Sequence, residues 1–220
     1  MKKNGFTLAE ILVALAIVGV VAAISIPGLV TESRKKVLAN SLSAAISNFE
    51  NAMTSYLIYE NKASLTETKA WTEDIDLADD KALGKRFRIE KKSSTAENYY
   101  TNAPKSLNPK STLPALSRAD ILGQAYEAHN GVVYFVNKDP KESGPAAKIG
   151  IDVNGKKVPN RIGRDIFVFF LDQDGYMIPY GKGDFGEPTL TEENCSTSVI
   201  GMVGEHCAAR LVKNGFKMDY

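Results

Sequence analysis

The chain has 220 residues, with 27 Lys and Arg against 26 Asp and Glu, a net charge of +1, 44% apolar residues and 24% charged residues. These values are average for a soluble globular protein and argue against a disordered chain or a multi-span membrane protein. The near-zero net charge does not favour a nucleic-acid-binding protein, and two cysteines exclude a disulfide-dense framework or a four-cysteine zinc site.

The N-terminal segment departs from this average. Residues 11–30 contain no charged side chain, and Glu10 is the only charged residue between Phe6 and Val30. A helix of about 20 residues spans the roughly 30 Å hydrocarbon core of a bilayer. A carboxylate inside such a segment costs about 2.5 to 3.5 kcal/mol on insertion scales, so Glu10 needs a partner.

Three interpretations of this segment compete: a secretory signal peptide, a plain membrane anchor, and a leader joined to an assembly helix. Lys2 and Lys3, the apolar run and the small residues of Val21-Ala22-Ala23 meet the requirements of a secretory signal. That interpretation leaves Glu10 unexplained.

The order of the residues carries a resemblance. A charged leader ending in Gly5, then Phe6-Thr7-Leu8-Ala9-Glu10, then an apolar helix resembles the N-terminus of type IV pilins and type II secretion pseudopilins. Pro27 also stands where members of that family carry a proline. The resemblance implies that a prepilin peptidase removes the leader, residues 1–5, and methylates the amine of Phe6.

The resemblance also implies a location and partners. The helix of residues 6–30 would hold the chain in the bacterial inner membrane as a single span, with the leader in the cytoplasm and the globular part in the periplasm or outside the cell. The implied partners are other pilin or pseudopilin subunits, the peptidase, a cytoplasmic assembly ATPase and an inner-membrane platform.

Glu10 and Pro27 are the candidate assembly residues. Cleavage leaves a cationic amine on Phe6, one helical turn from Glu10. This amine can pair with Glu10 of its own chain or, as the family implies, with Glu10 of a neighbouring subunit, where only docking satisfies both charges. Pro27 with Gly28 predicts a kink or local unwinding, either as a bend at the membrane boundary or as a segment that loosens on assembly.

Residues 31–60 are expected to continue the same helix to about Tyr59, roughly 80 Å in all. Apolar residues recur there at three- and four-residue steps and form one face that excludes Ser41, Asn48 and Asn51. The positions on this face are Leu38, Leu42, Ala45, Ile46, Phe49, Met53, Tyr56 and Leu57.

Residues 61–130 form a variable region of helices, strands and loops. An acidic cluster at residues 73–80 precedes a basic cluster at residues 85–92. Their closeness favours mutual neutralisation on a solvated face over nucleic-acid binding, although a DNA-uptake pilin is an alternative.

Residues 131–220 predict an antiparallel sheet on the amphipathic half of the helix, so the expected fold class is α+β and pilin-like. Asn154-Gly155 and Asp174-Gly175 are strong hairpin signals. The expected strands are short runs rich in Val, Ile, Phe and Tyr: Val132–Val136, Ile149–Val153, Ile166–Leu171 and Tyr176–Tyr180. A weaker resemblance to the C-terminal part of pilin-like proteins lies in Asp152-Val-Asn-Gly, Pro159-Asn, Gly163 and Asp165.

Asp152, Asn154, Asp172 and Asp174 are candidate calcium ligands, because they offer oxygen atoms and major pseudopilins bind calcium near their C-terminal loops. The same residues are typical of hairpin turns, and no twelve-residue loop ends in a glutamate, so the favoured prediction is a protein without a cofactor.

Cys195 and Cys207 can pair only with each other. In an oxidising compartment their disulfide would stabilise the fold by roughly 3 kcal/mol, because it closes a loop in the unfolded chain. The alternative is two buried free thiols. A disulfide near the C-terminus is also common in pilins.

The sequence contains no recognisable catalytic motif. The predicted function is therefore a non-enzymatic filament subunit, either a type II secretion pseudopilin or a minor type IV pilin, which acts in protein secretion, adhesion or motility. The alternative from another class is a secreted binding module or enzyme with an ordinary signal peptide.

Overall fold

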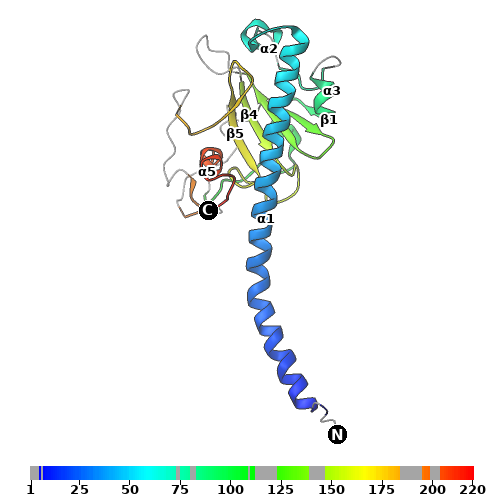
Figure 1. Cartoon of the computed structure of the whole chain (residues 1–220), viewed down its shortest axis with the longest axis vertical. Coiled ribbons are helices and arrows are strands. Elements are labelled where there is room, and N and C mark those ends of the chain that lie inside the picture. The colour runs from blue at the N-terminus through cyan, green and yellow to red at the C-terminus, as the bar shows by residue number, and fades with distance from the viewer. Residues whose placement is uncertain are drawn as a thin grey trace. The chain divides into compact units, whose positions relative to one another are not determined.

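The structure is a computed structural model that describes residues 5, 7–72, 75–79, 83–108, 110–111, 123–138, 147–183, 195–198 and 204–220. The chain divides into two compact units, Met1–Val37 and Leu38–Tyr220, which we call the stem and the C-terminal unit. One helix, α1 (Leu8–Glu60), begins in the stem and ends in the C-terminal unit (Figure 1). The predicted continuous helix is confirmed.

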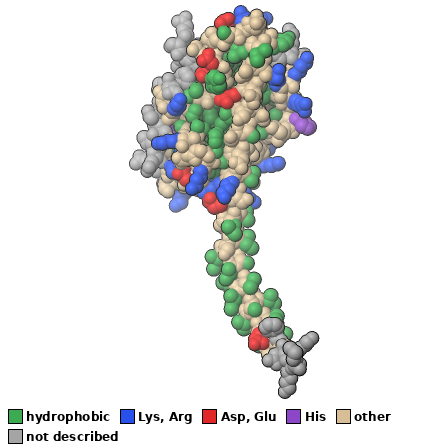
Figure 2. Space-filling model, viewed as in Figure 1, with side chains coloured by type: hydrophobic (Ala, Val, Ile, Leu, Met, Phe, Trp, Pro, Cys, Tyr) green, Lys and Arg blue, Asp and Glu red, His purple; other side chains and the backbone are tan. Residues whose placement is uncertain are grey.

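The stem part of α1 exposes its apolar side chains. Leu8, Ile24 and Leu29 are each at least 70% exposed, and Figure 2 shows hydrophobic side chains along this helix. Among the described residues, α1 is the one helix that is long and apolar enough to cross a membrane. Such a surface needs lipid or other protein around it, because water solvates it poorly.

The helix continues through Pro27 and Gly28 without interruption, so the structure does not have the local unwinding that the sequence predicts. A proline removes only one backbone donor from the helix, and the hydrogen bonds on either side hold the turn. The next turn gains one further bond, since the Thr31 hydroxyl donates to the Pro27 carbonyl at 2.9 Å.

The C-terminal unit contains a six-stranded sheet in which each strand is antiparallel to the next along the chain. The strands are β1 (Ile89–Ser93), β2 (Gln124–Ala128), β3 (Val133–Asn137), β4 (Ala147–Asp152), β5 (Ile166–Leu171) and β6 (Met177–Pro179). The last four overlap the predicted runs, and β5 coincides with its run. This sheet and the long helix give the α+β, pilin-like fold that the sequence predicts.

The second half of α1 packs on one face of the sheet (Figure 1). Phe49 is fully buried, and its ring lies 5.2 Å from Phe87 and 5.6 Å from Tyr134 between centroids. The predicted apolar face is confirmed, with Leu38 and Ile46 only partly buried at its edge. The buried residues of α1 are Ala39, Leu42, Ala45, Phe49, Ala52, Met53, Tyr56 and Leu57.

The opposite face of the sheet has its own core. Alternate residues of a strand point to opposite faces, and Phe135 accordingly belongs to a different cluster from Tyr134. Phe135 packs with Tyr99 and Tyr100, at the end of the short helix α4 (Ala96–Tyr99). The remaining short helices are η1 (Leu65–Glu67), α2 (Lys69–Thr72), α3 (Gly84–Phe87) and α5 (Cys207–Lys213).

The two predicted hairpin turns have different outcomes. Asp174-Gly175 does form the tight β5–β6 turn, with Gly175 at φ 88°. Asn154-Gly155 does not join two strands directly, because Asp152 pairs with Ile166 and the β4–β5 connection therefore runs over residues 153–165. The Asn-Gly pair forms a turn at the beginning of that connection, where Asp152 accepts its backbone N–H groups.

Candidate functional site

The N-terminal end of α1 is closed by Thr7 and Glu10. The Thr7 backbone N–H and hydroxyl both donate to Glu10 Oε2 at 2.8 Å, and the Glu10 N–H donates to the Thr7 hydroxyl at 3.3 Å. This reciprocal arrangement is a capping box, which satisfies the backbone N–H groups of Thr7 and Glu10. Glu10 therefore has a partner within its own chain that neither sequence interpretation named.

The cap leaves part of the Glu10 carboxylate available. Both hydrogen bonds from Thr7 end on Oε2, and Oε1 has no partner within the part of the chain that the structure describes. A carboxylate can accept several hydrogen bonds over its two oxygens. Glu10 can thus accept a cation at Oε1 while it still caps the helix.

The predicted cleavage position precedes the helix. Gly5 is exposed and lies outside α1. Phe6, the predicted methylation site, and the leader residues 1–4 lie outside the described residues.

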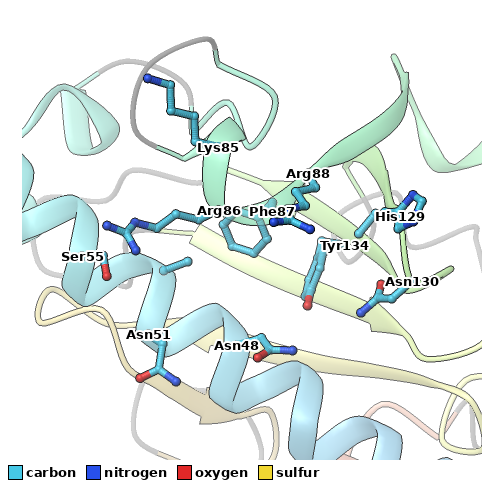
Figure 3. A pocket seen from close by; sticks show the side chains of 12 residues that line it. Asn48, Asn51, Ser55, Lys85, Arg86, Phe87, Arg88, His129, Asn130 and Tyr134 are labelled. Atoms are coloured by element: carbon cyan, nitrogen blue, oxygen red, sulfur yellow. The ribbon is translucent and has the colours of Figure 1, made fainter.

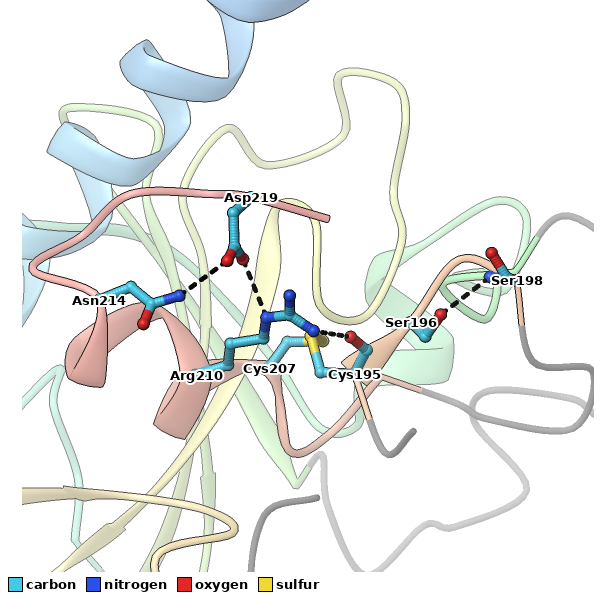
Figure 4. The surroundings of a disulfide bond; sticks show 7 residues. All are labelled: Cys195, Ser196, Ser198, Cys207, Arg210, Asn214 and Asp219. Carbon is cyan, nitrogen blue, oxygen red and sulfur yellow. Dashed lines mark hydrogen bonds and ion pairs between the residues drawn. A yellow bond between two sulfur atoms is a disulfide. The ribbon is translucent and has the colours of Figure 1, made fainter. Parts of the chain in front are cut away.

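Cys195 and Cys207 form a disulfide (Figure 4). Both cysteines are fully buried. Arg210, in α5, donates from Nη1 to the Cys195 carbonyl at 2.9 Å and from Nε to Asp219 Oδ1 at 2.8 Å. The guanidinium thus links Asp219, near the C-terminus, to Cys195 through hydrogen bonds.

We expect the double variant Cys195→Ser and Cys207→Ser to lower the free energy of unfolding by roughly 3 kcal/mol, since the open loop gives the unfolded chain more conformational freedom. Urea denaturation of the full chain in detergent measures this change. Adding reductant to the unaltered protein should reproduce the loss and leave the variant unaffected. Equal stability of all the samples would contradict a stabilising disulfide.

Two buried aspartates organise the β4–β5 connection. At the end of β4, Asp152 accepts the N–H groups of Asn154 and Gly155 at 3.0 and 2.9 Å and the hydroxyl of Tyr100. Just before β5, Asp165 accepts the N–H groups of Asn160 and Arg161 at 2.7 and 2.6 Å. Both carboxylates are completely buried and close two successive turns of the connection.

Burial raises the pKa of both carboxyl groups, to about 8 for Asp152 and about 6 for Asp165. Desolvation is the main cause in each case, because the buried environment disfavours the charged form. The hydrogen bonds that each carboxylate accepts oppose the rise, while the charge of Asp165 adds to it at Asp152.

The four candidate calcium ligands are divided between two turns. Asp172 accepts the N–H groups of Asp174 and Tyr176 at 3.0 and 2.7 Å in the β5–β6 turn, whereas Asp152 and Asn154 belong to the β4–β5 connection. In the described parts of the chain, no three His, Cys, Asp or Glu side chains gather where they could hold one metal ion. Backbone N–H groups take up the carboxylate oxygens instead, so the calcium hypothesis gains no support.

The comparisons with known proteins bear on the first part of the chain. Residues 1–26 match a family described as the prokaryotic N-terminal methylation motif. No curated protein and no solved structure matches the chain. Together with the apolar stem, the motif fits a membrane-anchored, single-pass protein. The match supports a prepilin-type signal of the kind that type IV pilins and pseudopilins carry at their N-termini.

Proposed function

We propose that this chain is a subunit of a helical filament, either a type II secretion pseudopilin or a minor type IV pilin. The observation that carries the proposal is the methylation motif of residues 1–26, which includes the beginning of α1, where the apolar side chains are exposed over a length that could cross a membrane. That surface is suited to lipid before assembly and to neighbouring stems afterwards. The C-terminal unit has its own core and contributes the contacts with cargo, a surface or other subunits.

In this proposal, processing and assembly are linked through Glu10. Removal of residues 1–5 creates a cationic amine on Phe6, which pairs with the Glu10 carboxylate of a neighbouring subunit. Burying either charge without a partner in the apolar interior of the filament costs free energy. The ion pair therefore favours the one position of neighbouring subunits in which both charges meet. Oε1 of Glu10, which bonds to no described residue, supports this pairing because it allows the carboxylate to keep its bonds to Thr7.

The proposed location is the bacterial inner membrane, with the C-terminal unit in the periplasm or, after assembly, outside the cell. An oxidising compartment there would suit the disulfide. Prepilin peptidase, an assembly ATPase and an inner-membrane platform would supply the covalent processing and the energy.

The intact mass of the mature protein tests the proposal. We expect a chain that lacks Met1–Gly5 and carries one methyl group on the amine of Phe6. In a host without prepilin peptidase, the same chain should keep its leader and its unmodified mass. Cleavage after Ala23 would instead support a secreted protein with an ordinary signal peptide and would overturn the proposal.

A further inference from the structure

A groove on the C-terminal unit separates α1 from the segment that contains α3 (Figure 3). Its volume is about 530 Å³. Asn48, Asn51 and Ser55 line one wall from α1. Lys85, Arg86 and Arg88 line the other wall, and Figure 3 shows Arg86 extending from α3 toward Ser55.

The α1 wall is polar and uncharged. Asn48, Asn51 and Ser55 are three and four residues apart, so they lie along one side of the helix. Carboxamides both donate and accept hydrogen bonds, as the hydroxyl of Ser55 also does. This wall is suited to a ligand that carries hydroxyl groups.

The opposite wall is cationic. Lys92 and Asp76 form an ion pair at 2.7 Å, so the expected neutralisation of the basic cluster is confirmed for that pair. Lys85, Arg86 and Arg88 form no ion pair with the described residues, and Glu73, Asp74 and Asp80 of the acidic cluster lie outside them. The nearby Asp79 carboxylate accepts the Gly84 N–H at 2.9 Å and thereby begins α3.

Arg88 has an unusual backbone conformation. It adopts φ 48° at the C-terminal end of α3, in the left-handed region where a glycine is favoured. Its N–H bonds to the Gly84 carbonyl at 3.0 Å, and its carbonyl accepts the His129 N–H at 3.1 Å. This left-handed conformation ends α3, as it commonly does at helix C-termini, and it fixes the backbone of Arg88 at the groove wall.

We infer that this groove binds a small hydroxylated compound carrying a phosphate or sulfate monoester. Arg86 and Arg88 contact the oxyanion, because planar guanidinium groups match its geometry in pairs of hydrogen bonds. Asn48 and Asn51 bind the hydroxyl groups. The groove volume lies within the range of small-molecule sites, about 300 to 1,000 Å³.

The test uses the full chain in non-ionic detergent, at constant ionic strength, with isothermal titration calorimetry. The probes are glucose 6-phosphate, glucose 6-sulfate, inorganic phosphate and uncharged glucose. We expect saturable binding of at least one of the two esters, which identifies the preferred oxyanion, weaker binding of inorganic phosphate and no binding of glucose. The inference is overturned if neither ester shows saturable binding. It is also overturned if a random duplex DNA binds at concentrations at which neither ester binds.

Two variants with the same loss of charge separate the groove from general electrostatics. Arg86→Gln with Arg88→Gln should weaken ester binding about tenfold or more. Lys91 and Lys157 are exposed and lie outside the groove. Lys91→Gln with Lys157→Gln should change the affinity for the ester by less than about twofold. Equal weakening in both variants would overturn the inference.

A third variant keeps the test valid if the double arginine variant unfolds. Asn51→Ala preserves every charge and suits an exposed helical position. It should weaken binding of the ester and leave that of inorganic phosphate unchanged. An unchanged affinity for the ester would count against the inferred role of the α1 wall.

Discussion

Replacing Glu10 by Gln is expected to prevent filament assembly while cleavage after Gly5 continues. Gln has no charge to pair with the amine of Phe6, so the proposed contact between subunits is lost. It still accepts a hydrogen bond and serves in a capping box as well as Glu does. The local cap formed with Thr7 therefore survives the substitution, and the lost charge is the main change.

Two further variants complete this experiment. Glu10→Val removes both the charge and the cap, and it should fail to assemble as Glu10→Gln does. Thr7→Ala removes the cap hydroxyl but keeps the Glu10 carboxylate. Thr7→Ala should assemble almost normally, because losing a cap costs only about 1 kcal/mol and the filament supplies many other contacts.

The measurement is the amount of the chain in a sheared filament fraction, with the extent of leader removal followed by mass spectrometry in the same cells. Normal filaments from Glu10→Gln, together with defective ones from Thr7→Ala, would assign Glu10 to helix capping alone. That result would remove the charge pair from the proposed assembly mechanism.

The long helix was predictable because its evidence is local. Glu10 and the uncharged run after it are adjacent in the sequence, and the apolar face of residues 38–57 repeats with the period of a helix. The capping box was also readable, as Thr7 and Glu10 have the T-x-x-E spacing. It was not predicted, because a carboxylate beside a membrane-length apolar run is first of all a costly charge.

Strands β1 and β2 were not predicted, and their composition explains why. β1 contains Glu90, Lys91 and Lys92 and is exposed at its three central residues, so it has no apolar alternation. It exists because β2 offers it a hydrogen-bonding edge, and that partner lies more than thirty residues later in the chain. Pairing over such a distance leaves little trace in the local sequence.

The groove was equally hidden. Its walls come from α1 and from residues 85–88, which the fold brings together only when α1 packs on the sheet. The sequence pattern correctly placed Asn48 and Asn51 off the buried face of α1, but it gave them no function. The basic cluster was interpreted as neutralised by the acidic cluster, and the structure confirms this for Lys92 with Asp76, whereas Glu73, Asp74 and Asp80 lie outside the described residues.

Asp165→Ala is expected to lower the free energy of unfolding by about 4 kcal/mol, because the buried N–H groups of Asn160 and Arg161 lose charge-assisted hydrogen bonds of roughly 1.5 to 3 kcal/mol each. Urea denaturation of the full chain in detergent at pH 7 measures the change. Asp174→Asn is the matched control, since the Asp174 side chain is exposed in the β5–β6 turn. Its effect should stay within about 0.5 kcal/mol.

The same variant should change how stability depends on pH. The pKa values of Asp152 and Asp165 are raised by burial to about 8 and about 6, above their ordinary value of 3.8, so the folded chain holds protons that the unfolded chain has released. The contribution of these two carboxyl groups to stability is therefore fully present below about pH 4 and is lost as the pH rises through about 6 and 8. Removing the Asp165 carboxylate deletes one of these two titrations and also lowers the pKa of Asp152, because a neighbouring negative charge is gone. The decline between pH 5 and 8 should consequently be smaller in Asp165→Ala than in the unaltered chain, although the variant is less stable at every pH in that range. An equally steep decline in both proteins would show that folding does not change the pKa of Asp165.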